Sequence, residues 1–115
     1  MTERQRTIIE DLDWRIHEAG YEDGGRCWEL EKYSPAGEDF TFTVGDKNLV
    51  ESISEYATDF DPDEHAEMWV RARYEGTDKT IPGIRTLVED ADVIKSMLEE
   101  LAAALRQTRL EDDRE

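Results

Sequence analysis

The spacing of apolar residues changes twice along this chain, and the change limits the folds open to it. In residues 27–44 apolar side chains recur at every second position, most clearly at Phe40, Phe42 and Val44. Before and after this stretch they recur at every third or fourth position, which is typical of one face of a helix. Period two predicts strands with one buried face. Because two strands alone are marginally stable in water, helices must cover that face. The sequence therefore predicts an α+β fold.

The first half of the chain is predicted to hold one helix and one hairpin. Residues 3–19 read as a single amphipathic helix that ends at Gly20. The turn formed by residues 34–37 joins two strands into an antiparallel hairpin, either alone or as part of a small sheet. The hairpin is expected to present one apolar face, which consists of Trp28, Leu30, Phe40, Phe42 and Val44.

The second half is predicted to be helical, which gives the order α-β-β-α-α-α. Asn48 and Glu51 fit a capping box at the start of one short helix. Asp61 and Pro62 fit the cap and the first position of the next. From about residue 83 a long apolar stripe runs to the end, either as one helix or as two, with Asp90 or Asp92 capping the second.

Charge and length bound the class of protein. The 115 residues include 30 acidic and 14 basic ones, and the net charge is −16. We expect a single domain over residues 1–110 and a disordered acidic tail over 111–115. An acidic chain is not expected to grip nucleic acid or an anionic membrane. Without a long apolar run or an apolar leader, and with Cys27 as its one cysteine, the chain is expected to be cytoplasmic.

Trp14 is the most informative candidate for contact with a partner. On a helix over residues 3–19 it falls opposite the apolar stripe, among acidic side chains. An aromatic side chain with an acidic rim would anchor a basic partner. The alternative is that another part of the fold covers Trp14. The candidate partner-binding residues are Trp14, Glu10, Asp13, His17 and Glu18.

The segment Asp59–Glu67 is the other candidate site, for a metal or an enzymatic function. Asp59, Asp61 and Asp63 have the spacing of the first calcium ligands of an EF-hand loop. The match fails where that loop needs glycine and a final glutamate, since Glu64 and Val70 stand there. A capped helix start explains the acids better. His65 lacks a nucleophile placed by any motif, so we predict no catalytic, cofactor-binding or metal-binding residue.

These observations favour a non-catalytic module that docks on a protein with a basic surface. One alternative is mimicry of DNA, because sixteen charges correspond to roughly 27 Å of duplex, within a domain expected to be roughly 35 Å across. A metal-dependent or enzymatic site at Asp59–Glu67 is the other. The chain is expected to be a monomer, or a weak homodimer through its C-terminal helix.

Three segments also carry a resemblance, namely Tyr33–Phe40, Asp59–His65 and Ile84–Ala91. They resemble small uncharacterised acidic proteins of gut bacteria and their mobile elements, over most of residues 26–105. The resemblance specifies no activity and transfers no functional residue. Small acidic proteins of mobile elements include restriction and CRISPR inhibitors that occupy DNA-binding sites, and this analogy makes the mimicry alternative an antirestriction or anti-CRISPR type.

Overall fold

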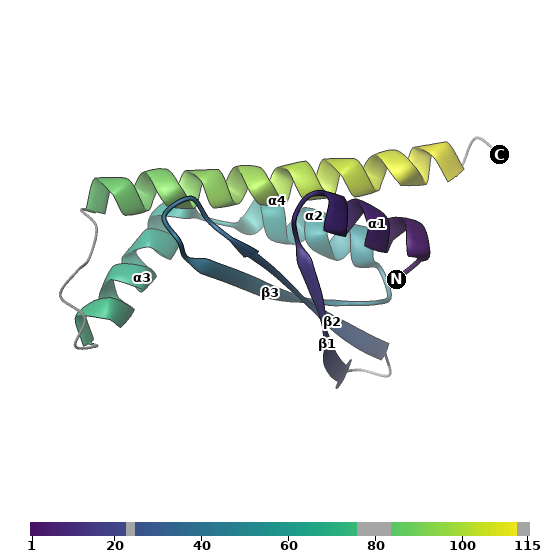
Figure 1. Ribbon diagram of the computed structural model, residues 1–115, viewed down its shortest axis with the longest axis horizontal. Coiled ribbons are helices and arrows are strands. Elements are labelled where there is room, and N and C mark those ends of the chain that lie inside the picture. Colours follow the sequence, from purple (N-terminus) through teal and green to yellow (C-terminus); the bar gives the residue numbers. More distant parts are fainter. Residues whose placement is uncertain (23–24, 76–83, 113–115) are drawn as a thin grey trace.

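The computed structural model describes residues 1–22, 25–75 and 84–112. This part of the chain forms an α+β fold with a three-stranded sheet (Figure 1). Its elements in chain order are α1 (Glu3–Asp11), β1 (Arg15–Glu22), β2 (Gly25–Tyr33), β3 (Asp39–Gly45), α2 (Leu49–Asp59), α3 (Pro62–Glu75) and α4 (Ile84–Asp112).

The predicted first helix is too long, because the chain changes direction after one short helix. α1 ends at Asp11, and Asp13 takes a left-handed conformation with φ 68° that redirects the backbone into β1. β1 pairs with β2, so the sheet is an antiparallel meander rather than a two-stranded hairpin. The alternation of β1 is weak, since only Ile16 is partly buried and its other described side chains are exposed. Gly20 does have a positive φ, but inside a bulge of β1 and not at a helix end.

The apolar face predicted for the hairpin is confirmed. Leu30 pairs with Phe42 and Trp28 with Val44 in the β2–β3 ladder, and all four side chains are buried with Phe40. Helices α1, α2 and α4 lie on that side of the sheet (Figure 1). The opposite face carries polar and charged residues and remains open. They are Arg15, His17, Glu29, Glu31, Tyr33, Asp39, Thr41 and Thr43.

The starts of α2 and α3 differ in how they are capped. The capping box predicted at Asn48 is wrong, since Asn48 is left-handed and its side chain makes no cap hydrogen bond. The cap predicted for α3 is confirmed: Asp61 Oδ1 accepts from the backbone N–H groups of Asp63 (3.0 Å) and Glu64 (3.4 Å). The sequence also predicts a loop over residues 77–82, which lies outside the described residues.

α4 is one uninterrupted helix that lies along the length of the molecule (Figure 1). Its apolar stripe is buried against α2, α3 and α1, including Ile94, Leu98 and Leu101, none of which has any exposed surface. The helix continues to Asp112, so residues 111–112 are helical, and residues 113–115 lie outside the described part. Among the helices that the structure describes, none has both the length and the apolar character needed to cross a bilayer.

Two charged side chains of α4 form hydrogen bonds to neighbouring elements, one to the β2–β3 turn and one to the end of α2. The carboxylate of Asp90 accepts from Ser34 Oγ (2.6 Å) and from the backbone N–H of Ala36 (2.9 Å), which ties the β2–β3 turn to α4. Asp90 therefore does not cap a second helix. Lys95 Nζ donates to the carbonyls of Ala57 (3.0 Å) and Phe60 (2.9 Å) at the C-terminal end of α2. These bonds hold the corner between α2 and α3 against α4.

Candidate functional site

Four of the five predicted partner-binding residues come together in one cavity of about 540 Å³ between α1 and β1. The lining includes Glu10, Asp13, Trp14 and His17, and Glu18 is not part of it. Arg6 and Arg15 also line this cavity, and Arg6 lies 4.0 Å from Glu10. Glu10 thus has a cation within reach, and two arginines share the lining of this cavity with the acids.

Trp14 is not an exposed anchor, because the fold covers it. Its side chain is 2% exposed and packs edge-on against Phe40 and Phe42, with ring centroids 6.3 and 5.6 Å away. Lys32 Nζ lies 5.9 Å from the centroid of the indole ring. The helix over residues 3–19 placed Trp14 on an exposed side, whereas the early end of α1 turns it into the core. The alternative, in which another part of the fold covers Trp14, is therefore confirmed.

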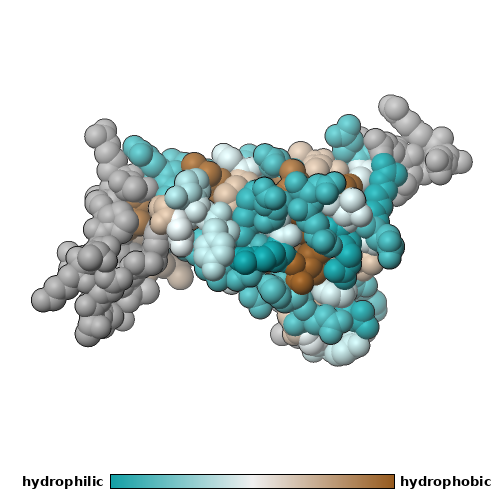
Figure 2. Space-filling model, in the orientation of Figure 1, coloured by the Kyte–Doolittle hydropathy of each residue, from teal (hydrophilic) through white to brown (hydrophobic). Residues whose placement is uncertain are grey.

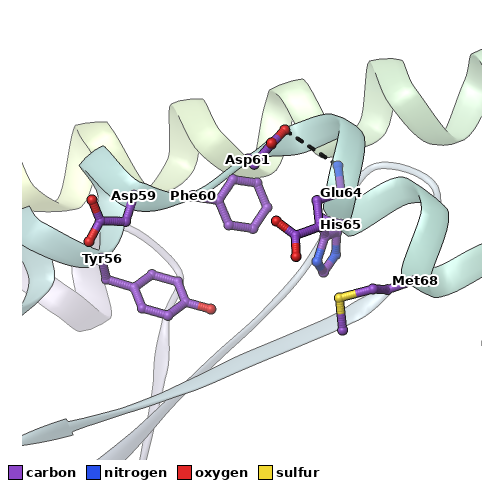
Figure 3. Close-up of a pocket in the computed structure, with 7 residues that line it drawn as sticks. All are labelled: Tyr56, Asp59, Phe60, Asp61, Glu64, His65 and Met68. Atoms are coloured by element: carbon purple, nitrogen blue, oxygen red, sulfur yellow. Dashed lines mark hydrogen bonds between the residues drawn. The ribbon is translucent and has the colours of Figure 1, made fainter.

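A different groove combines aromatic side chains with acids, at the corner where α2 meets α3 (Figure 3). Its volume is about 260 Å³. We call it the α2–α3 groove, and it is lined by Tyr56, Asp59, Phe60, Asp61, Glu64, His65 and Met68. Tyr56 and Asp59 lie on α2, Phe60 and Asp61 connect the helices, and the remaining residues lie on α3.

The floor of the α2–α3 groove is a layer of packed rings. Tyr56 stacks on Phe42 at 4.7 Å with an interplanar angle of 23°. Phe60 meets Phe40 edge-on at 5.8 Å and lies 5.1 Å from His65. The outer surface of this layer is open, since Tyr56 is 37% exposed and Met68 is 60% exposed. Partial burial of Tyr56 raises the pKa of its phenol.

His65 forms a close pair with a glutamate that sequence reasoning did not connect to it. His65 Nε2 lies 2.8 Å from Oε1 of Glu38, which sits in the turn before β3. The other carboxylate oxygen of Glu38 is buried and has no hydrogen-bond partner among the described residues. The two residues are 27 positions apart, and the pairing of Tyr33 with Asp39 places Glu38 in the turn before β3. No hydroxyl, thiol or amine of the described chain bonds to His65.

The acids around the groove have different roles. Asp61 caps α3 through its Oδ1, and its bond to the Glu64 N–H is drawn in Figure 3. Asp59 and Glu64 are exposed, and neither carboxylate forms an ion pair with a residue that the structure describes. The Glu64 carboxylate points toward Phe60, whereas Asp59 lies at the opposite end of the groove with its carboxylate directed away from Phe60 (Figure 3). The groove therefore has an apolar floor and an exposed acid at each end.

The described residues contain no group of three or more histidine, cysteine or acidic side chains placed to hold a metal ion. Asp61 is engaged by the helix start, which leaves Asp59 and Asp63 without the third ligand that the calcium spacing suggested. Cys27 is buried and unpaired, opposite Gly45 at the end of the β2–β3 ladder.

The comparisons with known proteins do not identify this chain. No family model matches it, and neither a curated protein nor a solved structure shows significant similarity. Inference about function therefore begins from the chain's own residues.

Proposed function

We propose that this protein is a docking module that binds a basic surface on a partner protein, as the sequence analysis expected. One observation supports it above the others. Residues 48–70, which span α2 and the first half of α3, include no lysine or arginine. The same stretch has seven acids, and six of them form an exposed group that we call the acidic corner: Glu55, Asp59, Asp61, Asp63, Glu64 and Glu67.

The distribution of cations supports this choice of surface. On the open face of the sheet, Arg15 lies 3.0 Å from Glu31 and 3.9 Å from Asp39. In the α1–β1 cavity, Arg6 and Arg15 line the wall beside Glu10 and Asp13. Among the side chains that the structure describes, no ion pair joins a cation to an acid of the acidic corner. A surface with a single sign of charge steers an oppositely charged partner and speeds its association at low salt.

Mimicry of DNA is a second candidate, and the shape of the molecule favours it. The longest dimension is 54 Å, against 27 and 22 Å across, so the domain is more elongated than the roughly 35 Å expected from its length. A net charge of −16 over that length is about half the charge density of duplex DNA. Figure 2 shows one face of this elongated body, and hydrophilic residues cover most of it.

Capture of partners from a bacterial lysate, compared between two charge variants, tests the docking proposal. The first variant changes three acids of the corner that lie outside the groove, through Glu55→Gln, Asp63→Asn and Glu67→Gln. The matched control removes the same charge from α4, through Glu89→Gln, Asp92→Asn and Glu99→Gln, all at exposed positions. Proteins captured at 50 mM salt are identified by mass spectrometry and eluted with increasing salt.

Docking through the acidic corner predicts basic proteins that the control variant retains and the corner variant loses. Competition by duplex DNA for the same captured proteins would favour mimicry of DNA. Equal capture by both variants would contradict a site at the corner, as would partners whose binding does not depend on salt.

A further inference from the structure

The α2–α3 groove has the chemistry of a receptor for one particular cationic side chain. Tyr56 presents one face of its ring to Phe42, and the residue is 37% exposed. An open aromatic face attracts a cation placed over it, because the ring carries negative charge density above its plane. Phe42 holds Tyr56 in place from below, so the platform is formed before any partner arrives.

Carboxylates lie at both ends of this platform. The Glu64 carboxylate and the Met68 thioether point toward the space over the rings, and Asp59 lies beyond Tyr56 (Figure 3). A cation stacked on Tyr56 would thus have an acidic residue at either end of the groove. Neither Glu64 nor Asp59 has a cation partner elsewhere in the described structure, so no existing ion pair has to break.

The form of the groove distinguishes between the two basic side chains. It has one open platform and does not enclose its ligand in a cage of rings. A planar guanidinium stacks on a single ring face and still donates in its own plane to carboxylates at the edges. An ammonium is a compact and strongly hydrated charge that gains less from such a site.

From this geometry we propose that the α2–α3 groove binds an arginine side chain of the partner, stacked on Tyr56 between Glu64 and Asp59. This inference rests on the proposed docking function and names the contact at its centre. The exposed Met68 would cover the aliphatic part of the arginine side chain, since flexible thioethers adapt to apolar surfaces. The remaining acids of the corner would then act at longer range.

The experiment titrates the full chain, labelled with ¹³C at its methionine methyl groups, with three capped peptides. The peptides are Gly-Arg-Gly, Gly-Lys-Gly and Gly-citrulline-Gly, so that charge and shape vary separately. The protein has three methionines, and only Met68 lines the groove. Met1 and Met97 pack against the core and serve as internal controls. We expect a saturable shift of the Met68 methyl with the arginine peptide, a smaller one with lysine and none with citrulline.

Substitutions then assign the contacts. Tyr56→Leu is expected to weaken binding of the arginine peptide about fivefold, the effect of about 1 kcal/mol of cation–π attraction. Tyr56→Phe keeps the ring and should bind like the wild type. Tyr56→Leu also changes the packing on Phe42, so a second variant at an exposed position is needed. Glu64→Gln removes one carboxylate of the groove and should also weaken binding of the arginine peptide. Glu99→Gln on α4 removes the same charge elsewhere and should change nothing.

The proposal is overturned if the arginine and citrulline peptides shift Met68 equally, or if Tyr56→Leu and Glu64→Gln bind as the wild type does. Its failure can be told apart from failure of the docking function. Capture of basic proteins that depends on Glu55, Asp63 and Glu67, with Met68 unmoved by arginine, would leave docking standing without this groove. A specific arginine shift without any salt-sensitive partner would leave the groove standing without the docking function.

Discussion

Trp14 and Asp90 both place polar atoms in the interior, but only those of Asp90 have hydrogen-bond partners among the described residues. The indole N–H of Trp14 is buried without a hydrogen-bond partner in the described structure. The carboxylate of Asp90 uses both oxygens, one for Ser34 and one for Ala36. A buried group without a partner loses its bond to water and gains nothing in return, whereas a satisfied one supports the fold. Removal of the Asp90 carboxylate should therefore lower the stability of the fold, whereas loss of the Trp14 N–H should by itself cost nothing.

Substitution of Trp14 separates the ring from its polar atom. Trp14→Ala is expected to lower the free energy of unfolding by about 3–5 kcal/mol, because it opens a large cavity beside Phe40 and Phe42. Trp14→Phe should lose clearly less, since it keeps an aromatic ring and removes the unpartnered N–H. Urea denaturation measures both. Tyr21→Ala, at a side chain that is 73% exposed, is the control and should change stability by less than about 0.5 kcal/mol. A stable Trp14→Ala variant would contradict this account of the core.

Removal of the Asp90 carboxylate should loosen the β2–β3 turn. Asp90→Ala leaves Ser34 Oγ and the Ala36 N–H without their acceptor, and we expect a loss of about 2–3 kcal/mol in the free energy of unfolding. Faster hydrogen exchange at Ala36 would locate the effect in the turn. Asp92→Ala is the matched control, since Asp92 is exposed on the same helix. Equal stability of the two variants would show that the bonds to the turn contribute little.

At the scale of elements, the corner between α2 and α3 depends on a cation from a third helix. The last carbonyls of a helix lack partners within it and carry partial negative charge. Lys95 of α4 donates to two such carbonyls, at Ala57 and Phe60, directly beneath the groove residues Tyr56 and Asp59. The position of the groove thus follows from packing between α2 and α4.

Lys95→Met keeps the apolar stem of the side chain and removes its donor. We expect a loss of about 1–2 kcal/mol in the free energy of unfolding, because two buried carbonyls lose a charged partner. The Met68 methyl resonance should also move as the corner relaxes. Arg106→Met, at an exposed position of the same helix, tests for a general effect of lost charge. An equal loss from both variants would argue against a specific role for Lys95.

The open face of the sheet contains a group of side chains that should respond to acid. Glu31 accepts a hydrogen bond from His17 Nε2 and forms an ion pair with Arg15 Nη2, each at 3.0 Å. The hydrogen bond with His17 and then that with Asp39 lower the pKa of Glu31, and the bond to Glu31 raises the pKa of Asp39. The lowered pKa gives a stabilisation that is present above the ordinary pKa of Glu31 and is lost as the pH falls through the folded value. The raised pKa of Asp39 acts in the opposite sense, favouring the folded state in acid.

His17→Ala removes the largest cause of the shift at Glu31. The pKa of Glu31 should therefore rise toward its ordinary value of 4.5, which a carboxyl-carbon NMR titration measures directly. Thr43→Ala lies on the same face and should leave that pKa unchanged. A pKa of Glu31 that is the same with and without His17 would show that Arg15 or Asp39 alone sets it.

Which elements could be predicted from the sequence follows from how strongly each one is buried. β3 and α4 have regular apolar patterns because one side of each faces the core, and the sequence predicts both as regular structure while leaving open whether α4 is one helix or two. β1 is an edge strand with one partly buried residue, Ile16, so its pattern was absorbed into a helix that began correctly near Glu3. The aromatic side chains of the α2–α3 groove come from both sides of the Asp61 cap. The apolar patterns of α2 and α3 do not indicate that Tyr56 and Met68 line the same groove.

At the scale of the whole molecule, the apolar stripe of α4 is used inside the fold, and the outer surface is dominated by charge. Leu98, Leu101 and Leu105 on α4 are completely buried within the molecule, so a homodimer through this helix would have to use other side chains. What remains outside is a surface with a net charge of −16 on an elongated body. Mutual repulsion of these charges lowers the stability of the folded state, which holds them closer together than the unfolded chain does.

Salt should therefore raise the melting temperature, in contrast to proteins stabilised mainly by surface ion pairs. At 0.1 M salt the screening length is about 10 Å, well below the 54 Å length of the molecule, so much of the long-range repulsion disappears. Thermal melts between 10 and 300 mM NaCl measure the effect, and a melting temperature that falls with salt would contradict it.

Calcium, magnesium, manganese and zinc salts are then compared with NaCl at equal ionic strength. A ligand that binds only the folded state raises its stability further. An additional rise with one of these ions, lost in Asp59→Asn, would instead support the metal site considered at Asp59–Glu67.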